Sequence, residues 1–460
     1  MIEDLKPYPG YKESGLPWLS NVPEHWDLVP NRGLVKKRKV IVGKRHKDYQ
    51  LLSLTKQGVI VRDISTGKGK FSSDMGTSQE VRVGDFVFCL FDVPETPRAV
   101  GLSRHAGMIT GAYTVLEYLK RGNPDYFEKY YLAMDDRKLL SPLYSGLRHT
   151  IPIDRLLGAK TPQPPPDEQA AIVRFLDHAN GKIDRAIRAK RKLIALLDEQ
   201  KQAIIHRAAT RGLDPNIKLK PSGIPWLGDV PEHWKLRRNS FLFDERNERG
   251  RVGLPILVVS LRTGVTEGND TDEDGREKRL IADVTKYKFA DKGDIAYNMM
   301  RMWQGAVGVV PVPGMVSPAY VVAKPRPGVL SAYYDHLFHT DDCKNEVNRH
   351  SRGIVTDRNR LYWDQFKRLF FPLPPYAEQQ MITNWIESET STLNSAVART
   401  EREIALLREY RTTLTAEVVT GKLDVREAAK RLPAESEAPL PVDDLAGDEI
   451  DDEVPEEIEA

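Results

Sequence analysis

SGLPWLSNVPEHW, residues 14–26, returns as SGIPWLGDVPEHW at residues 222–234. Ten of the thirteen positions are identical, including both tryptophans, both prolines and the Glu-His pair. A segment this rich in aromatic residues and proline does not recur by chance, and recurrence at a long period indicates that a whole structural unit is repeated. The chain is therefore expected to be a tandem duplication, and we call these two stretches the tryptophan segments.

A second repeated stretch begins with prolines and a Glu-Gln pair. Residues 162–214 align without a gap to residues 372–424, at a constant offset of 210. The prolines precede the helical pattern, where they do no harm, and acidic residues of the first copy fall in the first turn, where the helix dipole favours them. Gly212 and Gly421 mark the two ends. Each stretch is predicted to form one long helix.

The apolar positions shared by these two stretches fall into two columns spaced by four and three residues, the pattern of a coiled-coil seam. At 1.5 Å per residue each helix would be roughly 60 Å long, and the other copy is its obvious partner. If a two-fold axis relates the copies, the helices run antiparallel and hold the intervening domains near opposite ends of a rod. Polar residues that interrupt the seam are expected to help set its register: Lys190, Lys201, Thr400 and Arg411. The predicted seam consists of Leu176, Ile183, Ile187, Ile194, Leu197 and Ile204 in one helix and Ile386, Leu393, Val397, Ile404, Leu407 and Leu414 in the other.

The stretches between these repeats differ in sequence but carry landmarks in the same order. VGDFVFCLF (83–91) corresponds to KGDIAYNMM (292–300), and SGLRHTIPIDRLLG (145–158) to RGIVTDRNRLYWDQF (352–366). Apolar and aromatic letters after a Gly-Asp turn indicate a strand, so two mixed α/β domains are predicted. The predicted boundaries are an N-terminal segment 1–26, a first domain 27–161, a long helix 162–214, a repeated segment 215–234, a second domain 235–371, a second long helix 372–432 and a tail 433–460.

Charge divides the chain at Pro433. The full sequence carries a net charge of +2, but residues from Pro433 onward hold twelve acids and no base, which leaves +14 on residues 1–432. A body this basic indicates a polyanionic partner. The tail has few apolar and no aromatic side chains, the composition of a disordered segment. We expect it to serve solubility or, alternatively, to act as a DNA-mimicking brake on the basic body.

Composition excludes several classes of protein. No uninterrupted apolar run reaches about eighteen residues, and the N-terminus lacks the pattern of a signal peptide. Cys89 and Cys343 are isolated, which favours a reducing compartment and is too few for a zinc site of their own. A cytoplasmic protein without a membrane partner is expected.

A basic domain repeated with unlike sequence on a rigid spacer suits a duplex with two different half-sites. The doubled SG-x-PWL-x-x-VPEHW segment, the doubled proline-Glu-Gln helix start and the doubled heptad helix resemble the specificity (S) subunit of type I restriction–modification systems. The resemblance covers residues 10–430, with one variable domain before each helix. It implies two globular target-recognition domains, separated by two long antiparallel coiled-coil helices in a pseudo-two-fold tandem duplication.

The resemblance also implies what the partners supply. Two modification subunits would bring S-adenosylmethionine and methylate adenine N6, and restriction subunits, where present, would bring ATP hydrolysis, Mg²⁺ and cleavage of double-stranded DNA. This chain would hold no cofactor, metal or catalytic residue. The stretch LPPY (373–376) fits this expectation, because Leu373 stands where an adenine-binding methyltransferase motif has an acidic or amide residue.

Candidate DNA-binding residues follow from the chemistry of base edges and phosphates. Lys and Arg suit phosphates and guanine, and Asn and Gln suit adenine; for each arginine a surface ion pair is an equally good explanation. The first domain has a basic run that either contacts phosphates or forms a solvated face. It consists of Lys36, Lys37, Arg38 and Lys39. The loop candidates of the first domain are Arg98, Arg104, His105, Arg148, His149 and Thr150. Those of the second domain are Asn298, Arg301, Gln304, Arg352, Thr356, Arg358, Asn359 and Arg360.

The repeated tryptophans are expected to anchor each segment or to dock a subunit, because both copies keep them while the domains differ. His25 and His233 are not expected to be catalytic. Two other interpretations of the chain stay open, namely a recognition subunit of another methylating restriction class and, as a different class, a coiled-coil scaffold that joins two proteins without reading DNA. The charge of +14 speaks against the scaffold.

Overall fold

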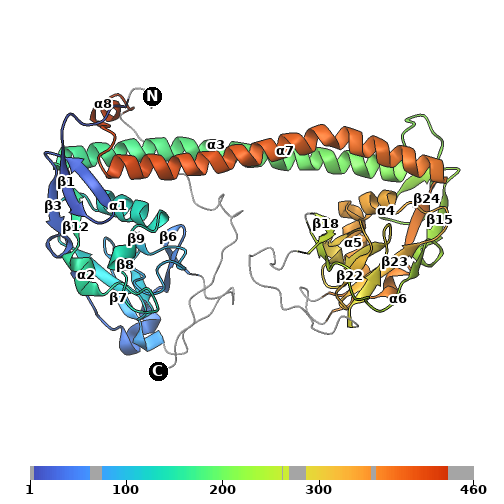
Figure 1. Cartoon of the computed structure of the whole chain (residues 1–460), viewed down its shortest axis with the longest axis horizontal. Helices are drawn as coiled ribbons and strands as arrows, with labels where there is room; N and C mark the ends of the chain where they lie inside the picture. The colour runs from blue at the N-terminus through green and yellow to red at the C-terminus, as the bar shows by residue number, and fades with distance from the viewer. Residues whose placement is uncertain (1–4, 63–74, 262, 269–285, 354–358, 434–460) are drawn as a thin grey trace. The chain divides into compact units, whose positions relative to one another are not determined.

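The structure is a computed structural model that describes residues 5–62, 75–261, 263–268, 286–353 and 359–433. The chain divides into two compact units, one made of residues 1–191 and 401–460 and the other of residues 192–400. Each unit contains one α/β domain, one tryptophan segment and parts of both long helices, coloured from blue to red along the chain in Figure 1.

The α/β domain of the first unit is built on a four-stranded antiparallel sheet with the strand order β4-β11-β8-β9. Alternate residues along β8 face opposite sides of this sheet. Phe86 and Phe88 join the core beneath helix α1, where the rings of Phe86 and Phe127 lie 4.9 Å apart, and Val87 packs into the second apolar layer. The elements of this domain are β4 (Val35–Lys37), β5 (Leu52–Thr55), β6 (Gly58–Val61), β7 (Gln79–Val81), β8 (Phe86–Phe88), β9 (Val100–Leu102), β10 (Gly107–Ile109), β11 (Thr114–Tyr118), α1 (Pro124–Asp136) and α2 (Ile153–Gly158).

The α/β domain of the second unit repeats this topology strand for strand, with the order β16-β23-β20-β21. Helix α4 takes the place of α1, and Tyr334 packs on Phe243 with ring centroids 5.3 Å apart. The two domains therefore share one fold despite their unlike sequences. The elements are β16 (Phe243–Glu245), β17 (Leu257–Ser260), β18 (Gly264–Glu267), β19 (Lys288–Ala290), β20 (Ile295–Asn298), β21 (Val307–Val309), β22 (Gly314–Val316), β23 (Tyr320–Pro325), α4 (Ser331–Phe338), α5 (Asp341–His350) and α6 (Trp363–Phe366).

The Gly-Asp landmarks of the sequence form the turns that lead into β8 and β20. Asp85 is buried, accepts a hydrogen bond from the Arg82 amide at 2.8 Å and pairs with the Arg38 guanidinium. Asp294 repeats the arrangement with Arg246, whose Nε donates at 2.6 Å, and burial raises the pKa of the Asp294 carboxyl. Each turn is thus tied to the segment that follows the edge strand of the sheet.

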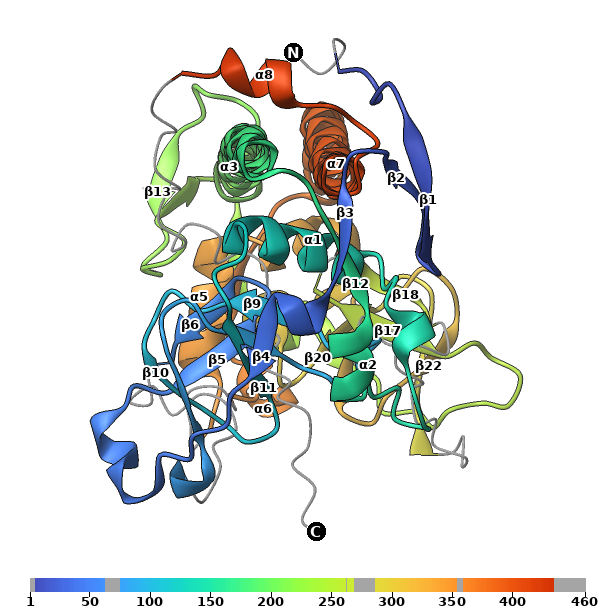
Figure 2. The ribbon, with the colours of Figure 1, turned by 90° about the vertical axis from the view of Figure 1, so that its left-hand side faces the viewer.

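Short antiparallel strands connect each domain to the long helices. β3 pairs with β12 in the first unit and β15 with β24 in the second. The hairpin β1–β2 and its counterpart β13–β14 carry the tryptophan segments, and Figure 2 shows β1 and β2 beside the end of α7. The bounds of these strands are β1 (Tyr11–Leu16), β2 (Leu19–Pro23), β3 (Asp27–Pro30), β12 (Lys160–Gln163), β13 (Leu219–Pro221), β14 (Asp229–Pro231), β15 (Lys235–Arg238) and β24 (Phe370–Leu373).

The two predicted long helices are confirmed as α3 (Pro166–Arg211) and α7 (Tyr376–Val419). The second ends before the predicted boundary at residue 432, because the backbone turns at Gly421, whose φ is 76°, and a separate short helix α8 (Arg426–Lys430) follows. Within each unit α3 and α7 run side by side (Figure 1). In the first unit Arg411 donates to Asp184 at 2.9 Å, and in the second Lys201 donates to Asn394 at 2.7 Å. These are the same pair in the two copies, because both members are shifted by the repeat offset of 210.

The polar interruptions of the seam make most of these cross-helix bonds. Lys190 also donates to Glu403 at 2.6 Å, so position 184 faces 411 and position 190 faces 403, which is an antiparallel register. Thr400 instead donates to the Ala396 carbonyl of its own helix. Each of the twelve residues of the predicted seam is buried or half-buried.

Candidate nucleic-acid interface

The last two residues of each tryptophan segment, a histidine and a tryptophan, contact a carboxylate in the first turn of a long helix. In the first unit Glu168 accepts hydrogen bonds from Trp26 Nε1 at 2.8 Å and from Tyr8 Oη at 2.6 Å, and His25 Nε2 lies 2.8 Å from its second oxygen. The Glu168 side chain is only 4% exposed. Burial and the bond to Glu168 raise the pKa of Tyr8, so its hydroxyl stays protonated and donates.

The second unit repeats this site with one partner fewer. Glu378 accepts a hydrogen bond from Trp234 Nε1 at 3.0 Å and lies 2.7 Å from His233 Nε2. The tryptophan segments are related by an offset of 208, so Asn216 stands at the position that corresponds to Tyr8. The Glu378 side chain is 17% exposed. The repeated His-Trp pairs therefore hold the start of a long helix.

The end of the other long helix packs against the same segment. Gly421 has a φ of 76°, and a Cβ added there would lie 2.3 Å from the Pro23 ring and 3.0 Å from Trp26. Gly212 has a φ of 75°, and a Cβ there would lie 3.5 Å from Trp234. Only glycine fits the closer of these two positions without displacement. Each tryptophan segment thus joins the start of one long helix to the end of the other.

The glutamine after each of these glutamates fixes the α/β domain of its unit to the helix. Gln169 accepts from the Asn123 amide at 2.7 Å, just before α1, and donates to the Pro164 carbonyl at 2.8 Å. Gln379 accepts from the Leu330 amide at 2.8 Å, just before α4, in the same way. Each Glu-Gln pair therefore joins two parts of its unit to the start of a long helix. The glutamate binds the tryptophan segment, and the glutamine binds the α/β domain.

Two tyrosines join each α/β domain to the end of the other long helix. Tyr126 of α1 donates to the Val419 carbonyl at 3.2 Å, and Tyr333 of α4 donates to the Ala209 carbonyl at 2.6 Å. The two acceptors are 210 residues apart and lie in the last turns of α7 and α3. We call the tryptophan segments, the Glu-Gln pairs, these tyrosines and the long helices the repeated frame.

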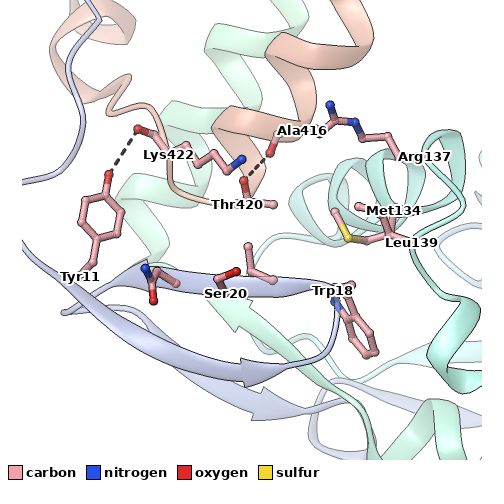
Figure 3. Close-up of a pocket in the computed structure, with 11 residues that line it drawn as sticks. Tyr11, Trp18, Ser20, Met134, Arg137, Leu139, Ala416, Thr420 and Lys422 are labelled. Atoms are coloured by element: carbon pink, nitrogen blue, oxygen red, sulfur yellow. Dashed lines mark hydrogen bonds between the residues drawn. The ribbon is translucent and has the colours of Figure 1, made fainter.

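A pocket of about 330 Å³ opens on this frame in the first unit, between β1–β2, the end of α1 and the end of α7 (Figure 3). Trp18 and Met134 supply apolar walls, and the Trp18 indole donates to Tyr130 Oη at 3.0 Å. Tyr11 donates to the Lys422 carbonyl at 3.3 Å. The pocket belongs to the frame and contains none of the candidate DNA-binding residues.

In the first domain the structure brings four of the candidate residues onto two adjacent loops, 89–99 after β8 and 145–150 before α2. The Ile151 amide donates to the Leu90 carbonyl at 2.7 Å, which holds the loops together. We call these loops loop pair 1. They carry the candidates Arg98, Arg148, His149 and Thr150.

The second domain has a corresponding loop pair 2, which in the described residues comprises 299–306 after β20 and 352–353 with 359–360 before α6. Here the Leu361 amide donates to the Met299 carbonyl at 2.8 Å, and Arg352 and Arg360 exchange two backbone hydrogen bonds of 2.9 Å. Positions 354–358, with the candidates Thr356 and Arg358, lie outside the described residues. At or beside loop pair 2 are the candidates Asn298, Arg301, Gln304, Arg352, Asn359 and Arg360.

Several candidate arginines already bind carboxylates of their own domain. Arg98 donates to Asp136 at 2.6 Å and is 16% exposed, whereas Arg148 donates to Asp92 at 2.9 Å and keeps half of its side chain exposed. Arg104 pairs with Asp125 at the start of α1 and remains more than half exposed. Ion pairing therefore leaves Arg104 and Arg148 accessible and encloses most of Arg98.

In the basic run of the first domain, the arginine is enclosed while the three lysines are exposed. Arg38 is 9% exposed and binds Asp85 and Glu80, so its guanidinium serves the fold and the candidate phosphate role does not suit it. Lys36 and Lys37 are exposed on the edge strand β4, and Lys39 is exposed just after it. These lysines, with Arg104 and His105 on the loop 103–106, lie outside the two loop pairs.

The two loop pairs and the lysines of β4 carry hydrogen-bonding and positively charged side chains. Within the described parts of the chain, no group of three or more His, Cys, Asp and Glu side chains could hold a metal ion. No helix among the described residues is long and apolar enough to cross a membrane. Cys89 and Cys343 are both buried free thiols, and burial raises the pKa of each.

Two features of this site were not anticipated from the sequence. The carboxylates of Glu168 and Glu378 organise the frame, and the doubled Glu-Gln pair was the available signal, which had been interpreted only as a helix start. The second feature is Leu147 in loop pair 1, whose side chain is 99% exposed. An isolated leucine in a sequence reads as a core residue, so no sequence signal marked it.

This fold defines a class of protein in which two α/β domains are attached to a pair of long helices. No family profile matches the chain, and no curated protein matches it. A chain from a structure describing complex assembly and conformational transition of the type I R-M system matches with a TM-score of 0.57 and 14% identity, over 87% of this chain and 99% of that chain.

Two further solved structures match over most of their length. The HsdS subunit from Thermoanaerobacter tengcongensis is 15% identical over 88% of this chain and 98% of its own, with a TM-score of 0.40. The type I restriction–modification S subunit from M. genitalium is 12% identical over 90% of this chain and 98% of its own, with a TM-score of 0.33. The resemblance expected from the sequence is confirmed at the level of the fold by the match with the type I R-M system chain.

Proposed function

We propose that this chain is the DNA-specificity subunit of a type I restriction–modification complex. It binds an asymmetric, bipartite duplex through its two recognition domains. It directs partner subunits to methylate adenine N6 or to cleave unmodified DNA. The chain itself supplies recognition, and the partners bind S-adenosylmethionine, ATP and Mg²⁺.

The observation that carries this proposal is a frame present twice with unlike loops. The contacts of Glu168 and Glu378, and the pairs that join Arg411 to Asp184 and Lys201 to Asn394, repeat between the units. The loop pairs differ in both length and residue type. A fixed frame with two different sets of loops is what the recognition of two different half-sites requires.

The repetition of the frame also favours two copies of a partner. Each unit presents its own tryptophan segment, helix start and helix end, so two modification subunits can use equivalent surfaces. The net charge of +14 on residues 1–432 supports DNA as the further partner, because phosphate contacts dominate the affinity of DNA-binding proteins.

The proposal is tested with the full chain purified together with its methyltransferase partner. We expect one copy of this chain with two of the partner, and selection from random duplexes at fixed salt should yield one bipartite motif with unlike halves. A complex that binds all duplexes equally well after correction for salt would rule out recognition. Stable association with the partner combined with that result would favour the scaffold interpretation instead.

A further inference from the structure

The tip of loop pair 1 presents an apolar side chain to solvent. Leu147 is 99% exposed, the highest value among the large hydrophobic residues of the described ranges. Its neighbours Gly146, Arg148 and His149 are also exposed. A protein-binding patch would need a continuous apolar surface, and Leu147 stands alone among polar groups.

The loop that carries Leu147 is a closed hairpin. The amides of Ser145 and Thr150 each donate to the carbonyl of the other, at 2.8 and 3.1 Å, and the His149 amide donates to the Gly146 carbonyl at 3.3 Å. A side chain on such a hairpin loses little backbone freedom when it binds, because the loop is already ordered by its own hydrogen bonds.

The hairpin is fastened to the loop opposite by a reciprocal contact. The Asp92 amide donates to the Arg148 carbonyl at 3.0 Å, and the Arg148 guanidinium donates to the Asp92 carboxylate at 2.9 Å. Asp92 and His149 have φ values of 46° and 43°, which non-glycine residues adopt at an energetic cost. The domain therefore keeps a strained backbone at the place where it projects Leu147.

We propose that Leu147 is an apolar wedge that enters the DNA between two stacked base pairs of the half-site read by the first domain. This inference rests on the proposed function and names the residue that deforms the target. Leucine is among the side chains that proteins insert between base steps, and such insertion unstacks and kinks the duplex. Arg148 and His149 flank the wedge and can donate to phosphates or base edges beside the step.

The second domain carries a similar sequence at the same place, because Gly353-Ile354 follows Arg352 as Gly146-Leu147 follows Ser145. Ile354 lies outside the described residues, so the inference concerns the first domain alone. Unstacking costs less at flexible pyrimidine–purine steps, and a wedge would therefore add specificity at a step that no hydrogen bond reads.

The test uses the full chain in its complex with the methyltransferase partner and the bipartite duplex obtained by selection. 2-Aminopurine replaces, one at a time, the adenines of the half-sites other than those that are methylated. With the native chain we expect a fluorescence increase at one step. L147A should abolish that increase and weaken binding roughly ten-fold, whereas L147M should retain both. V83A, which shortens another exposed side chain of this domain, is the matched control and should behave as the native chain.

Equal fluorescence and affinity for L147A and the native chain would overturn the wedge, and so would weaker binding with the fluorescence increase retained. Because Leu147 makes no buried contact, L147A should melt at the native temperature, which separates the outcome from unfolding. A native complex without any duplex preference would overturn the proposed function and the wedge together. A native complex with a normal preference that L147A leaves unchanged would overturn the wedge alone.

Discussion

Replacing Glu168 by alanine removes the acceptor that joins the first tryptophan segment to α3. Two of its donors, the Tyr8 hydroxyl and the Trp26 indole, are buried and would lose their partner, while His25 is 40% exposed and can turn to water. A buried donor left unpaired costs about 1–3 kcal/mol. E168A should therefore destabilise the first unit by about 4 kcal/mol.

The second unit provides an internal comparison. Glu378 serves one buried donor, Trp234, and the half-exposed His233, so E378A should cost about 2 kcal/mol by the same reasoning. The predicted order, with E168A more costly than E378A, follows directly from the presence of Tyr8 in one copy and Asn216 in the other.

Native-state hydrogen exchange is the appropriate assay, because unfolding of a chain with two units is not a two-state transition. Amides of α1 report on the first unit and amides of α4 on the second. D167A and E387A, which remove exposed acids from α3 and α7, are the controls and should change protection by less than about 1 kcal/mol. Equal losses for E168A and E378A, or losses no larger than those of the controls, would refute the buried-acceptor account.

The other predictions concern the ends and length of the helices and one histidine. G421A should destabilise the first unit more than G212A destabilises the second, measured by the same exchange, because the added Cβ meets the Pro23 ring at 2.3 Å in one case and nothing closer than 3.3 Å in the other. Burial, with the nearby charges of His339 and Lys201, lowers the pKa of His336 to about 4 from 6.5. The unfolded chain then binds the proton more readily, so the second unit should lose up to about 3 kcal/mol as the pH falls from 6.5 to 4. H336Q should remove that loss, measured as the protection of the α4 amides against hydrogen exchange at each pH. Inserting seven residues in each long helix, between the cross-helix bonds, should lengthen the preferred DNA spacer by about three base pairs, since it adds about 10 Å. An unchanged spacer in a duplex selection would refute the idea that the helices measure distance.

The sequence was sufficient to predict the two long helices and the tryptophan segments because each of them occurs twice in it. A constant offset of 210 identified both long helices. The paired landmarks made β8 correspond to β20, and the loop before α2 correspond to the loop before α6. The polar interruptions of the seam pointed to the register, and three of the four bond the opposite helix.

The roles of individual side chains could not be predicted in the same way. The sequence predicts a phosphate contact or a solvated face for Arg38, but its carboxylate partner Asp85 is 47 residues away and is brought to it only by the sheet. Glu168 meets Trp26 across 142 residues. Burial of a charge and exposure of Leu147 both depend on long-range packing, which residue type and spacing do not encode.

We propose that this chain alone decides which adenines its partners methylate. Mapping of N6-methyladenine in cells that carry the chain and its partner genes tests it most directly. Methylation should fall in one asymmetric bipartite motif with a constant spacer, disappear when the gene for this chain is deleted, and change in one half only when residues 235–371 are replaced by a domain of the same fold. A methylation pattern that survives the deletion, or a motif without two unlike halves, would contradict the claim.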